Sequence, residues 1–225
     1  MGSSLYHWNF APVLENLDVL WAGALGTLRL FAICAVLGLG AGLVVALGRI
    51  ARSRWIHAPA TAFVEFFRNT PVLVQILWFY YALPILLPFQ ISPLAAAALG
   101  ISLNSAAFSA EIYRGGIESI DRGQAEAARA LGMTAWQAMR RVVLPQALRR
   151  MLPALTNRGI EIFKMTTLAS AIAYVELLQQ GKLLASLNFN PIETYTVIAV
   201  VFFLCLFPLV QLTYALERRL GRSDA

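Results

Sequence analysis

Long uncharged stretches of this chain alternate with short stretches that are rich in arginine. Two uncharged stretches, 30–48 and 194–216, are each long enough to cross the hydrocarbon core of a bilayer, about 30 Å thick, as an α-helix. A third uncharged stretch is too long for one crossing and is interrupted by prolines. It predicts two membrane-spanning helices, over 70–87 and 93–111, joined by a proline-rich turn.

The basic residues set the number of crossings. They gather in three clusters, at 49–54, 114–150 and 218–222. Because Lys and Arg favour the cytoplasmic side of a membrane, we expect all three clusters on that side, which requires a further crossing over 152–176. Hydropathy alone rates that segment poorly, since it contains charged residues. The pattern predicts an all-α integral membrane protein with five transmembrane helices, the N-terminus outside and the C-terminus inside.

Three parts of the chain follow from this topology. Residues 1–19 are expected to form an extracytoplasmic or interfacial lead-in, with Tyr6 and Trp8 at the membrane surface, where amphipathic aromatic rings are enriched. Residues 20–216 are expected to form the transmembrane domain. Residues 217–225 are expected to form a basic cytoplasmic tail.

The composition supports the assignment as a membrane protein and indicates which partners to expect. Apolar residues make up 59% of the 225 residues and charged residues 13%, whereas a soluble domain usually carries about 25% charged residues. Membrane lipid is therefore an expected partner. The net charge of +6 at pH 7 is accounted for by the cytoplasmic clusters, so nucleic acid is not expected as a partner.

Residues 121–145 are expected to form two short cytoplasmic helices that meet at Gly132, a residue that readily adopts the positive φ that ends a helix. A capping-box pattern marks each start, at Asp121-x-x-Gln124 and at Thr134-x-x-Gln137. Pro145 is expected to end the second helix. A DNA-binding helix-turn-helix has a similar outline, but the flanking spans hold this segment against the bilayer. A loop that merely packs on its own bundle is the plain alternative.

One pattern on this segment resembles the EAA loop of the permease subunits of ABC importers: Glu126-Ala127-Ala128-x3-Gly132-x9-Val142-x-Leu144-Pro145. The loop usually has Ile where this chain has Val142, a conservative apolar change. The run over 110–128 and the run Phe67-Arg68-Asn69-Thr70-Pro71-Val72-Leu73-Val74-Gln75 resemble the polar amino acid (histidine/glutamate-type) permease family. The resemblance covers about residues 20–216.

This resemblance implies a bacterial inner-membrane protein that works with other chains. It implies an ABC ATPase subunit, which uses ATP and Mg, and an extracytoplasmic substrate-binding protein. It also implies a second permease subunit, identical or related. No cofactor is expected on this chain itself. The residues implied at the ATPase interface are Glu126, Ala127, Ala128, Leu131 and Gly132.

The fourth predicted span carries Arg158, Glu161 and Lys164 at intervals of three, which makes them neighbours on a helix surface. Ionisable residues inside a bilayer cost at least about 2.5–3.5 kcal/mol each on insertion scales, so they usually mark function. Glu161 is expected to pair with one of the two cations, which leaves the other for a substrate carboxylate. These three residues and Thr167 are the predicted substrate contacts. The sequence leaves open whether the three charged residues line the transport pathway or the dimer interface.

Two runs look most like glutamate/aspartate-type permeases, Phe163-Lys164-x-Thr166-Thr167-Leu168-Ala169-Ser170 and Gln180-Gly181-Lys182-Leu183-Leu184. This looser resemblance implies glutamate, aspartate or their amides as the substrate. Two further ion pairs are expected near helix ends on spacing alone, Glu111 with Arg114 and Glu65 with Arg68.

The chain contains no G-x4-GK[ST] motif, so the energy for transport must come from a partner or an ion gradient. The alternative function is therefore an ion-coupled secondary transporter with Glu111 or Glu161 as its proton site. Such transporters often contain two related halves, and no internal repeat is visible here. An enzyme is not expected, because neither HExxH nor GxSxG occurs.

Overall fold

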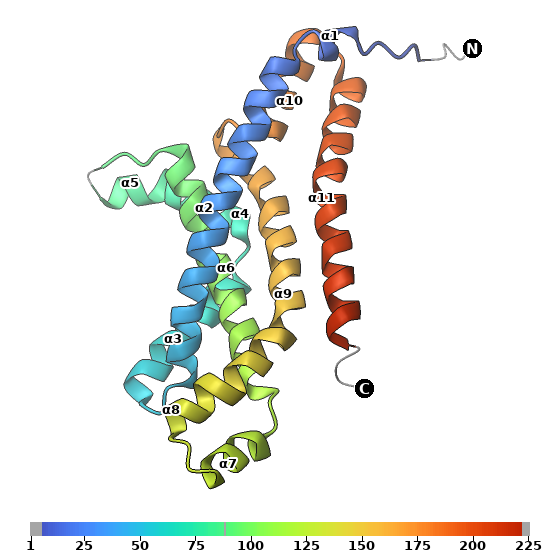
Figure 1. The fold of residues 1–225 in the computed structure, drawn as a ribbon. Helices are drawn as coiled ribbons and strands as arrows, with labels where there is room; N and C mark the ends of the chain where they lie inside the picture. Colours follow the sequence, from blue (N-terminus) through green and yellow to red (C-terminus); the bar gives the residue numbers. More distant parts are fainter. Residues whose placement is uncertain (1–5, 88, 222–225) are drawn as a thin grey trace, which may run out of the picture.

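The computed structural model describes residues 6–87 and 89–221, and every regular element within these ranges is a helix (Figure 1). The predicted all-α fold is confirmed for this part of the chain. Residues 1–5 of the predicted lead-in and 222–225 of the predicted tail lie outside the described residues, as do the side chains of 219–221.

Among the described residues, three helices are long and apolar enough to cross a membrane: α2 (Leu17–Ile50), α6 (Pro93–Glu118) and α11 (Pro191–Gly221). Each contains one of the predicted spans and extends beyond it. The difference is greatest for α2, whose helix begins well before the predicted start at residue 30. The predicted span marked only the uncharged stretch, whereas the helix continues through Arg29 and Asp18.

Two helices pass the same test only as a pair. These are α3 (Arg54–Asn69) and the segment Val72–Leu86, which are bent by 103° at the break between them. Thr70 and Pro71 at this break have extended backbones, as expected for a proline and the residue before it. The predicted span over 70–87 corresponds to the second member of the pair, and α3 was not predicted.

The other helical elements are shorter. They are α1 (Ala11–Leu14), α4 (Val72–Leu77), the π-helical turn η1 (Trp78–Ala82), α5 (Leu83–Leu86), α7 (Arg122–Ala130), α8 (Ala135–Ala138), the π-helical turn η2 (Met139–Val143), α9 (Leu144–Met165), the 3₁₀ turn η3 (Thr166–Ile172) and α10 (Leu177–Asn188). α9 is not among the helices that are apolar enough to span by composition, in keeping with its charged residues.

Pro145 does not end the second helix of the 121–145 segment, so this prediction was wrong. α8 continues through η2 directly into α9, and Pro145 lies in the first turn of α9. Proline lacks the N–H that an α-helix bonds four residues back, and the wider π-helical turn before it accommodates that loss. The same arrangement precedes Pro84, where η1 leads into α5.

The predicted span 152–176 is not one continuous helix. α9 ends at Met165, and η3 and a short loop separate it from α10. Ala173 in this break has a left-handed backbone with a φ of 55°. No glycine or proline marks the position in the sequence, so no local signal argued against the single crossing that the basic clusters required.

Contacts with α2 explain the break. The Tyr174 hydroxyl donates to the Gly26 carbonyl oxygen at 3.1 Å, and the Leu177 N–H donates to Thr27 Oγ1 at 3.1 Å. A Cβ atom on Gly26 would lie 1.9 Å from the Val175 carbonyl oxygen, so only glycine permits this approach. Residues distant in sequence therefore hold the break open.

The most extensive helix–helix contact joins α2 and α6. A Cβ atom on Gly38 would lie 2.6 Å from Cβ of Ser105, and one on Gly42 would lie 2.6 Å from Cβ of Ser109. Small residues at such a contact let two backbones approach closely, which is how helices pack tightly within a membrane. This contact holds α2 and α6 close together.

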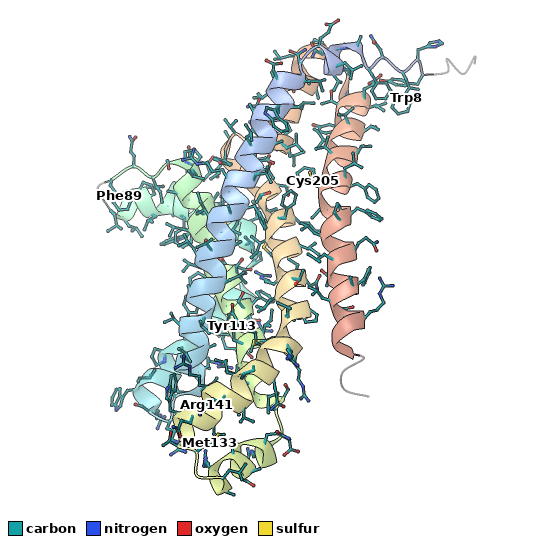
Figure 2. All side chains as sticks on the ribbon, in the orientation of Figure 1. Trp8, Phe89, Tyr113, Met133, Arg141 and Cys205 are labelled. Atoms are coloured by element: carbon teal, nitrogen blue, oxygen red, sulfur yellow. The ribbon has the colours of Figure 1, made fainter. Side chains whose placement is uncertain are left out.

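The ends of the bundle differ in character. α7 and α8 lie at one end, and the N-terminal segment with the start of α11 lies at the other (Figure 1). Met133 and Arg141 mark the first end, and Trp8 marks the second (Figure 2). At the second end the buried Glu193 carboxylate accepts from the Tyr6 hydroxyl at 2.7 Å and from the Asn9 N–H at 2.8 Å, which ties the N-terminal segment to α11.

Candidate functional site

The 121–145 segment begins with the predicted helix–glycine–helix. Asp121 caps α7, because its Oδ1 accepts from the Gly123 N–H at 2.6 Å. Thr134 and Gln137 form a complete capping box at the start of α8, with bonds of 2.9 and 3.3 Å. Gly132 has a φ of 85° and ends α7. The Asp121 cap, the Thr134 capping box and the Gly132 turn are confirmed, whereas the predicted capping box at Asp121 is incomplete, since the Gln124 side chain accepts from Gln146 instead.

One face of this segment packs on the bundle, and the other face is exposed. Ala128 is buried, so it contributes to the packing of the segment and not to its outer surface. Leu131 is 82% exposed and Trp136 is 70% exposed, which is unusual for large apolar side chains beside a charged helix. Of the other predicted contact residues, Glu126, Ala127 and Gly132 are exposed. Trp136 was not among the predicted contacts.

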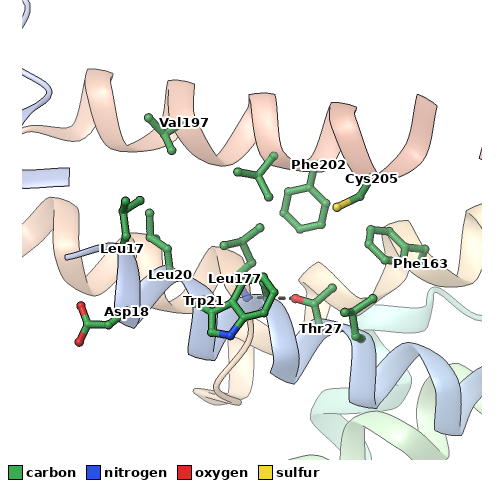
Figure 3. A pocket seen from close by; sticks show the side chains of 13 residues that line it. Leu17, Asp18, Leu20, Trp21, Thr27, Phe163, Leu177, Val197, Phe202 and Cys205 are labelled. Carbon is green, nitrogen blue, oxygen red and sulfur yellow. Dashed lines mark hydrogen bonds between the residues drawn. The ribbon is translucent and has the colours of Figure 1, made fainter. Parts of the chain in front are cut away.

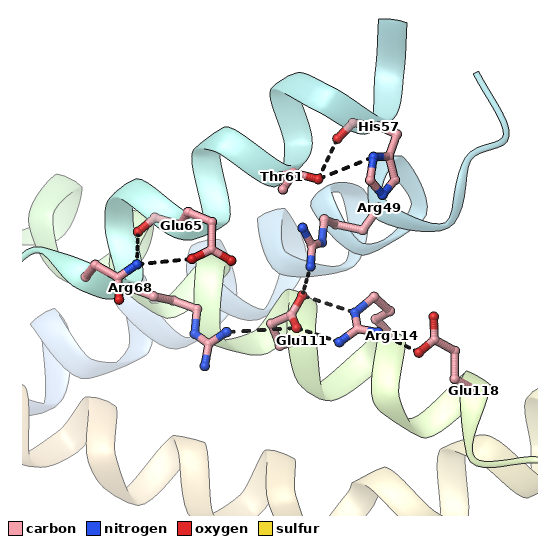
Figure 4. Close-up of polar contacts among 9 residues, drawn as sticks. Arg49, His57, Thr61, Glu65, Arg68, Glu111, Arg114 and Glu118 are labelled. Carbon is pink, nitrogen blue, oxygen red and sulfur yellow. Dashed lines mark hydrogen bonds and ion pairs between the residues drawn. The ribbon is translucent and has the colours of Figure 1, made fainter. Parts of the chain in front are cut away.

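A carboxylate hub joins three helices just inside the bundle from this segment (Figure 4). Glu111 on α6 pairs with Arg114 at 2.7 Å, with Arg49 at the end of α2 at 3.1 Å, and with Arg68 at the end of α3 at 3.9 Å. The predicted pair of Glu111 with Arg114 is confirmed. The predicted pair of Arg68 with Glu65 was wrong, since Glu65 accepts a hydrogen bond from Asn69 instead.

A polar cavity of about 350 Å³ opens beside this hub. Its lining residues come from α3, α6 and α9: Arg68, Phe108, Glu111, Ile112, Ala154, Asn157, Arg158 and Glu161. The Phe108 ring lies near two guanidinium groups, with its centroid 4.6 Å from Cζ of Arg158 and 5.1 Å from Cζ of Arg68. Such cation–π contacts hold cations beside an apolar surface.

Arg158 is the most buried charge in this cavity. It is 2% exposed and donates to Glu161 at 2.7 Å, to Asn104 at 2.9 Å and to Ser105 at 3.2 Å. The predicted pairing of Glu161 with a neighbouring cation is confirmed, and the cation is Arg158. Glu161 itself is 48% exposed. The accessible charges of the cavity are therefore Glu161 and Arg68.

The structure separates the predicted substrate contacts into two groups. Arg158 and Glu161 line the polar cavity, whereas Lys164 and Thr167 are not among its lining residues. Lys164 is exposed, and the Thr167 hydroxyl donates to the Lys164 carbonyl oxygen at 2.8 Å. Sequence reasoning missed Arg68, Phe108 and Asn157, although Arg68 lies within a run that carried the family resemblance.

A second cavity, of about 630 Å³, lies between α2 and α11 and is almost wholly apolar (Figure 3). Trp21, Phe163 and Phe202 line it, with Asp18 at its edge. It offers few groups that could bind a polar solute. Within the described residues, no group of three or more His, Cys, Asp or Glu side chains is placed to hold a metal ion.

Comparison with known proteins identifies the family of this chain. The family described as "Binding-protein-dependent transport system inner membrane component" matches residues 38–222. The chain belongs to this family. Among similar proteins, the "Glutamine transport system permease protein GlnP" of Escherichia coli (strain K12) is 38% identical over 95% of this permease and 98% of its own length. The "Arginine transport system permease protein ArtQ" of Bacillus subtilis (strain 168) is 32% identical over 96% and 99%.

Solved structures agree with this assignment. The permease matches the "Crystal structure of an amino acid ABC transporter with histidines" with a TM-score of 0.89 and 33% identity, over 95% of this chain and 100% of that chain. A structure of the MetNI methionine ABC transporter matches with a TM-score of 0.76 at 22% identity, over 92% and 98%, and shows the shared fold. This chain is thus the permease subunit of an amino acid ABC transporter, and in this family ATP is hydrolysed by a separate subunit.

Proposed function

We propose that this permease forms the membrane pathway of an importer for polar amino acids in the bacterial inner membrane. The observation that carries the substrate class is the polar cavity at Arg68, Asn157, Arg158 and Glu161. An amino acid has a carboxylate and an ammonium group at neutral pH. A cavity with an accessible cation and an accessible anion offers a partner to each.

The topology proposed for this function has five membrane crossings. These are α2, the segment Val72–Leu86, α6, α9 continued by α10, and α11. The N-terminus lies outside and the C-terminus inside, since this orientation alone keeps the three basic clusters on the cytoplasmic side. The domain division into 1–19, 20–216 and 217–225 follows from it.

The 121–145 segment is proposed to bind the ATPase subunit. Its exposed face combines large apolar side chains, Leu131 and Trp136, with the Glu126 carboxylate. A central apolar anchor with charged residues around it is typical of a protein interface. Two permease subunits, identical or related, would enclose the pathway and each would bind one ATPase, while a substrate-binding protein delivers the amino acid from outside.

The cavity favours an amide over an acidic substrate. Its accessible charges are one cation, Arg68, and one anion, Glu161, so it has no second accessible cation for a second carboxylate. Lys164, one of the two cations from which the sequence argument drew a surplus, does not line it. Glutamine or asparagine is therefore the proposed substrate ahead of glutamate and aspartate, and the 38% identity to a glutamine permease supports this choice.

The ion-coupled alternative is not supported. In the family to which the chain belongs, a separate subunit hydrolyses ATP, so an ion gradient is not needed as the energy source. Glu111 is paired with three arginines. This environment holds a carboxylate in its charged form and makes it a poor proton carrier.

The test is substrate-stimulated ATP hydrolysis by the complete complex in proteoliposomes. The permease is co-expressed with its ATPase and substrate-binding protein, and ATP hydrolysis is measured with glutamine, asparagine, glutamate, aspartate, arginine and histidine. Glutamine or asparagine should give the greatest stimulation. Stimulation of ATP hydrolysis by arginine or histidine alone would contradict the proposed substrate but not the assignment of the chain as a permease. Failure of any ATPase to co-purify would overturn the proposed partnership.

A further inference from the structure

Helix α3 carries a strip of apolar side chains that the rest of the described chain does not cover. Trp55 is 91% exposed, Phe66 is 62% exposed, and Ile56 is also exposed. Val64, on the adjoining side of the helix, is buried against Ala46 and Ala110. The strip is therefore solvent-facing in the isolated chain although α3 itself is firmly packed.

The opposite side of α3 is polar. His57, Thr61, Glu65 and Arg68 follow one another along the helix (Figure 4), at the spacing of three and four residues that defines one helical face. Arg68 reaches the Glu111 hub from this side. α3 is thus an amphipathic helix whose polar face adjoins the charged network and whose apolar face points away from it.

α3 begins beside the charged end of α2, where the surface of a membrane is expected. It follows the end of α2 closely and turns by 103° before the next spanning segment. Its first turns pack on the last turn of α2, where a Cβ atom on Gly48 would lie 3.0 Å from Cβ of Ala60. The start of α3 therefore lies at the membrane interface, where the apolar face of an amphipathic helix is buried among acyl chains.

The charges beside the N-terminal part of the exposed strip are positive. Arg52 and Arg54 precede Trp55 and are exposed. No acidic residue occurs between Arg49 and Val64. Arg49 is paired with Glu111, but across the part of the chain that the structure describes, neither Arg52 nor Arg54 has an acidic side chain within ion-pair distance.

We propose that α3 is a binding surface for anionic phospholipids. Trp55 and Phe66 insert among the acyl chains, and Arg52 and Arg54 contact headgroup phosphates, which basic residues beside a membrane attract. A second copy of this chain fits less well, because it carries a net charge of +6 and offers little negative charge to these arginines. The inference depends on neither the transported amino acid nor the ATPase.

The test counts the lipids that the purified full-length chain retains. The chain is placed in nanodiscs of equal parts phosphatidylglycerol and phosphatidylcholine, released, and analysed by native mass spectrometry. The double variant R52Q/R54Q should lower the preference for phosphatidylglycerol by about five-fold for each arginine removed, which corresponds to about 1 kcal/mol per basic residue near the surface. The matched control R122Q/R129Q removes two exposed arginines from α7 and should leave the preference unchanged.

A second pair of variants separates lipid from protein as the occupant. W55S/F66S should reduce retention of both lipids, since it removes the apolar strip and keeps the charges. In a C205S background, W55C should show no chain-to-chain crosslink in nanodiscs that contain two copies. The proposal is overturned if R52Q/R54Q keeps the wild-type lipid preference, if R122Q/R129Q loses as much of it, or if W55C crosslinks efficiently between chains.

Discussion

The Arg49 guanidinium in the last turn of α2 lies 3.1 Å from the Glu111 carboxylate on α6, so an ion pair locks together the helices that share the closest contact in the bundle. Glu111 also holds Arg68 and Arg114. A single carboxylate thus contacts three cations from three helices. Its removal would leave these cations facing one another.

The substitution Glu111→Gln should therefore destabilise the permease. Loss of the charge-assisted bonds is expected to cost about 1.5–3 kcal/mol. Thermal unfolding of the purified chain in detergent measures this cost. The control is Glu118→Gln, which removes a more exposed carboxylate that pairs with Arg114 alone among the described residues, and it should cost less than about 1 kcal/mol. Equal losses of stability in the two variants would contradict the central role of Glu111 in the hub.

Substitutions at Glu161 and Lys164 should show which of the two side chains contacts the substrate. Glu161→Gln is expected to lower substrate-stimulated ATP hydrolysis about 10- to 100-fold, the equivalent of one charge-assisted bond to a substrate ammonium. Lys164→Gln should stay close to the wild-type rate, because Lys164 does not line the cavity. Both rates are measured at equal amounts of assembled complex. The reverse order of effects would restore Lys164 as the substrate contact.

The glycines of α2 offer a test of helix packing. Gly38→Val should destabilise the chain by about 1–3 kcal/mol, the usual cost of overfilling a close contact, because a Cβ atom there meets Ser105 at 2.6 Å. Gly40→Val should be tolerated, since a Cβ atom at Gly40 has no atom within 4 Å. Yield and thermal stability in detergent report the difference. If Gly40→Val were equally harmful, a general intolerance of valine in this helix would explain the loss.

The exposed end of the 121–145 segment should decide whether the ATPase stays bound. Leu131→Ser removes a large apolar side chain and is expected to weaken ATPase binding at least 10-fold, as for a central interface residue. Ala130→Ser alters its exposed neighbour without removing apolar area and should have little effect. Co-purification of the ATPase with each variant measures the outcome. Retention of the ATPase by Leu131→Ser would place its binding surface elsewhere.

The parts of the fold that sequence predicted well are those fixed by local chemistry. An uncharged stretch such as 194–216 has few stable alternatives to a membrane helix, and it lies within α11. The Thr134 capping box and the positive φ of Gly132 likewise depend on neighbouring residues only. Both are present as predicted.

The parts that sequence missed depend on contacts between distant segments. The break after Met165 is held by bonds to Gly26 and Thr27 on α2, and nothing near the break in sequence announces it. Arg68 pairs with Glu111 across two helices instead of with its neighbour Glu65. Helix α3 was overlooked because a short amphipathic helix gives a weak signal in a search for uncharged spans.

The uninterrupted passage of the chain through Pro145 has a mechanical consequence. From Ala135 to Met165 the backbone is helical without a break, roughly 45 Å along its axis at 1.5 Å per residue, and it includes the π-helical turn η2 and Pro153. One end of this helical segment carries Trp136, and Arg158 and Glu161 lie near the other. A tilt imposed on the exposed end therefore reaches the cavity along one continuous helix, and η2 and Pro153 are the places where that helix can bend.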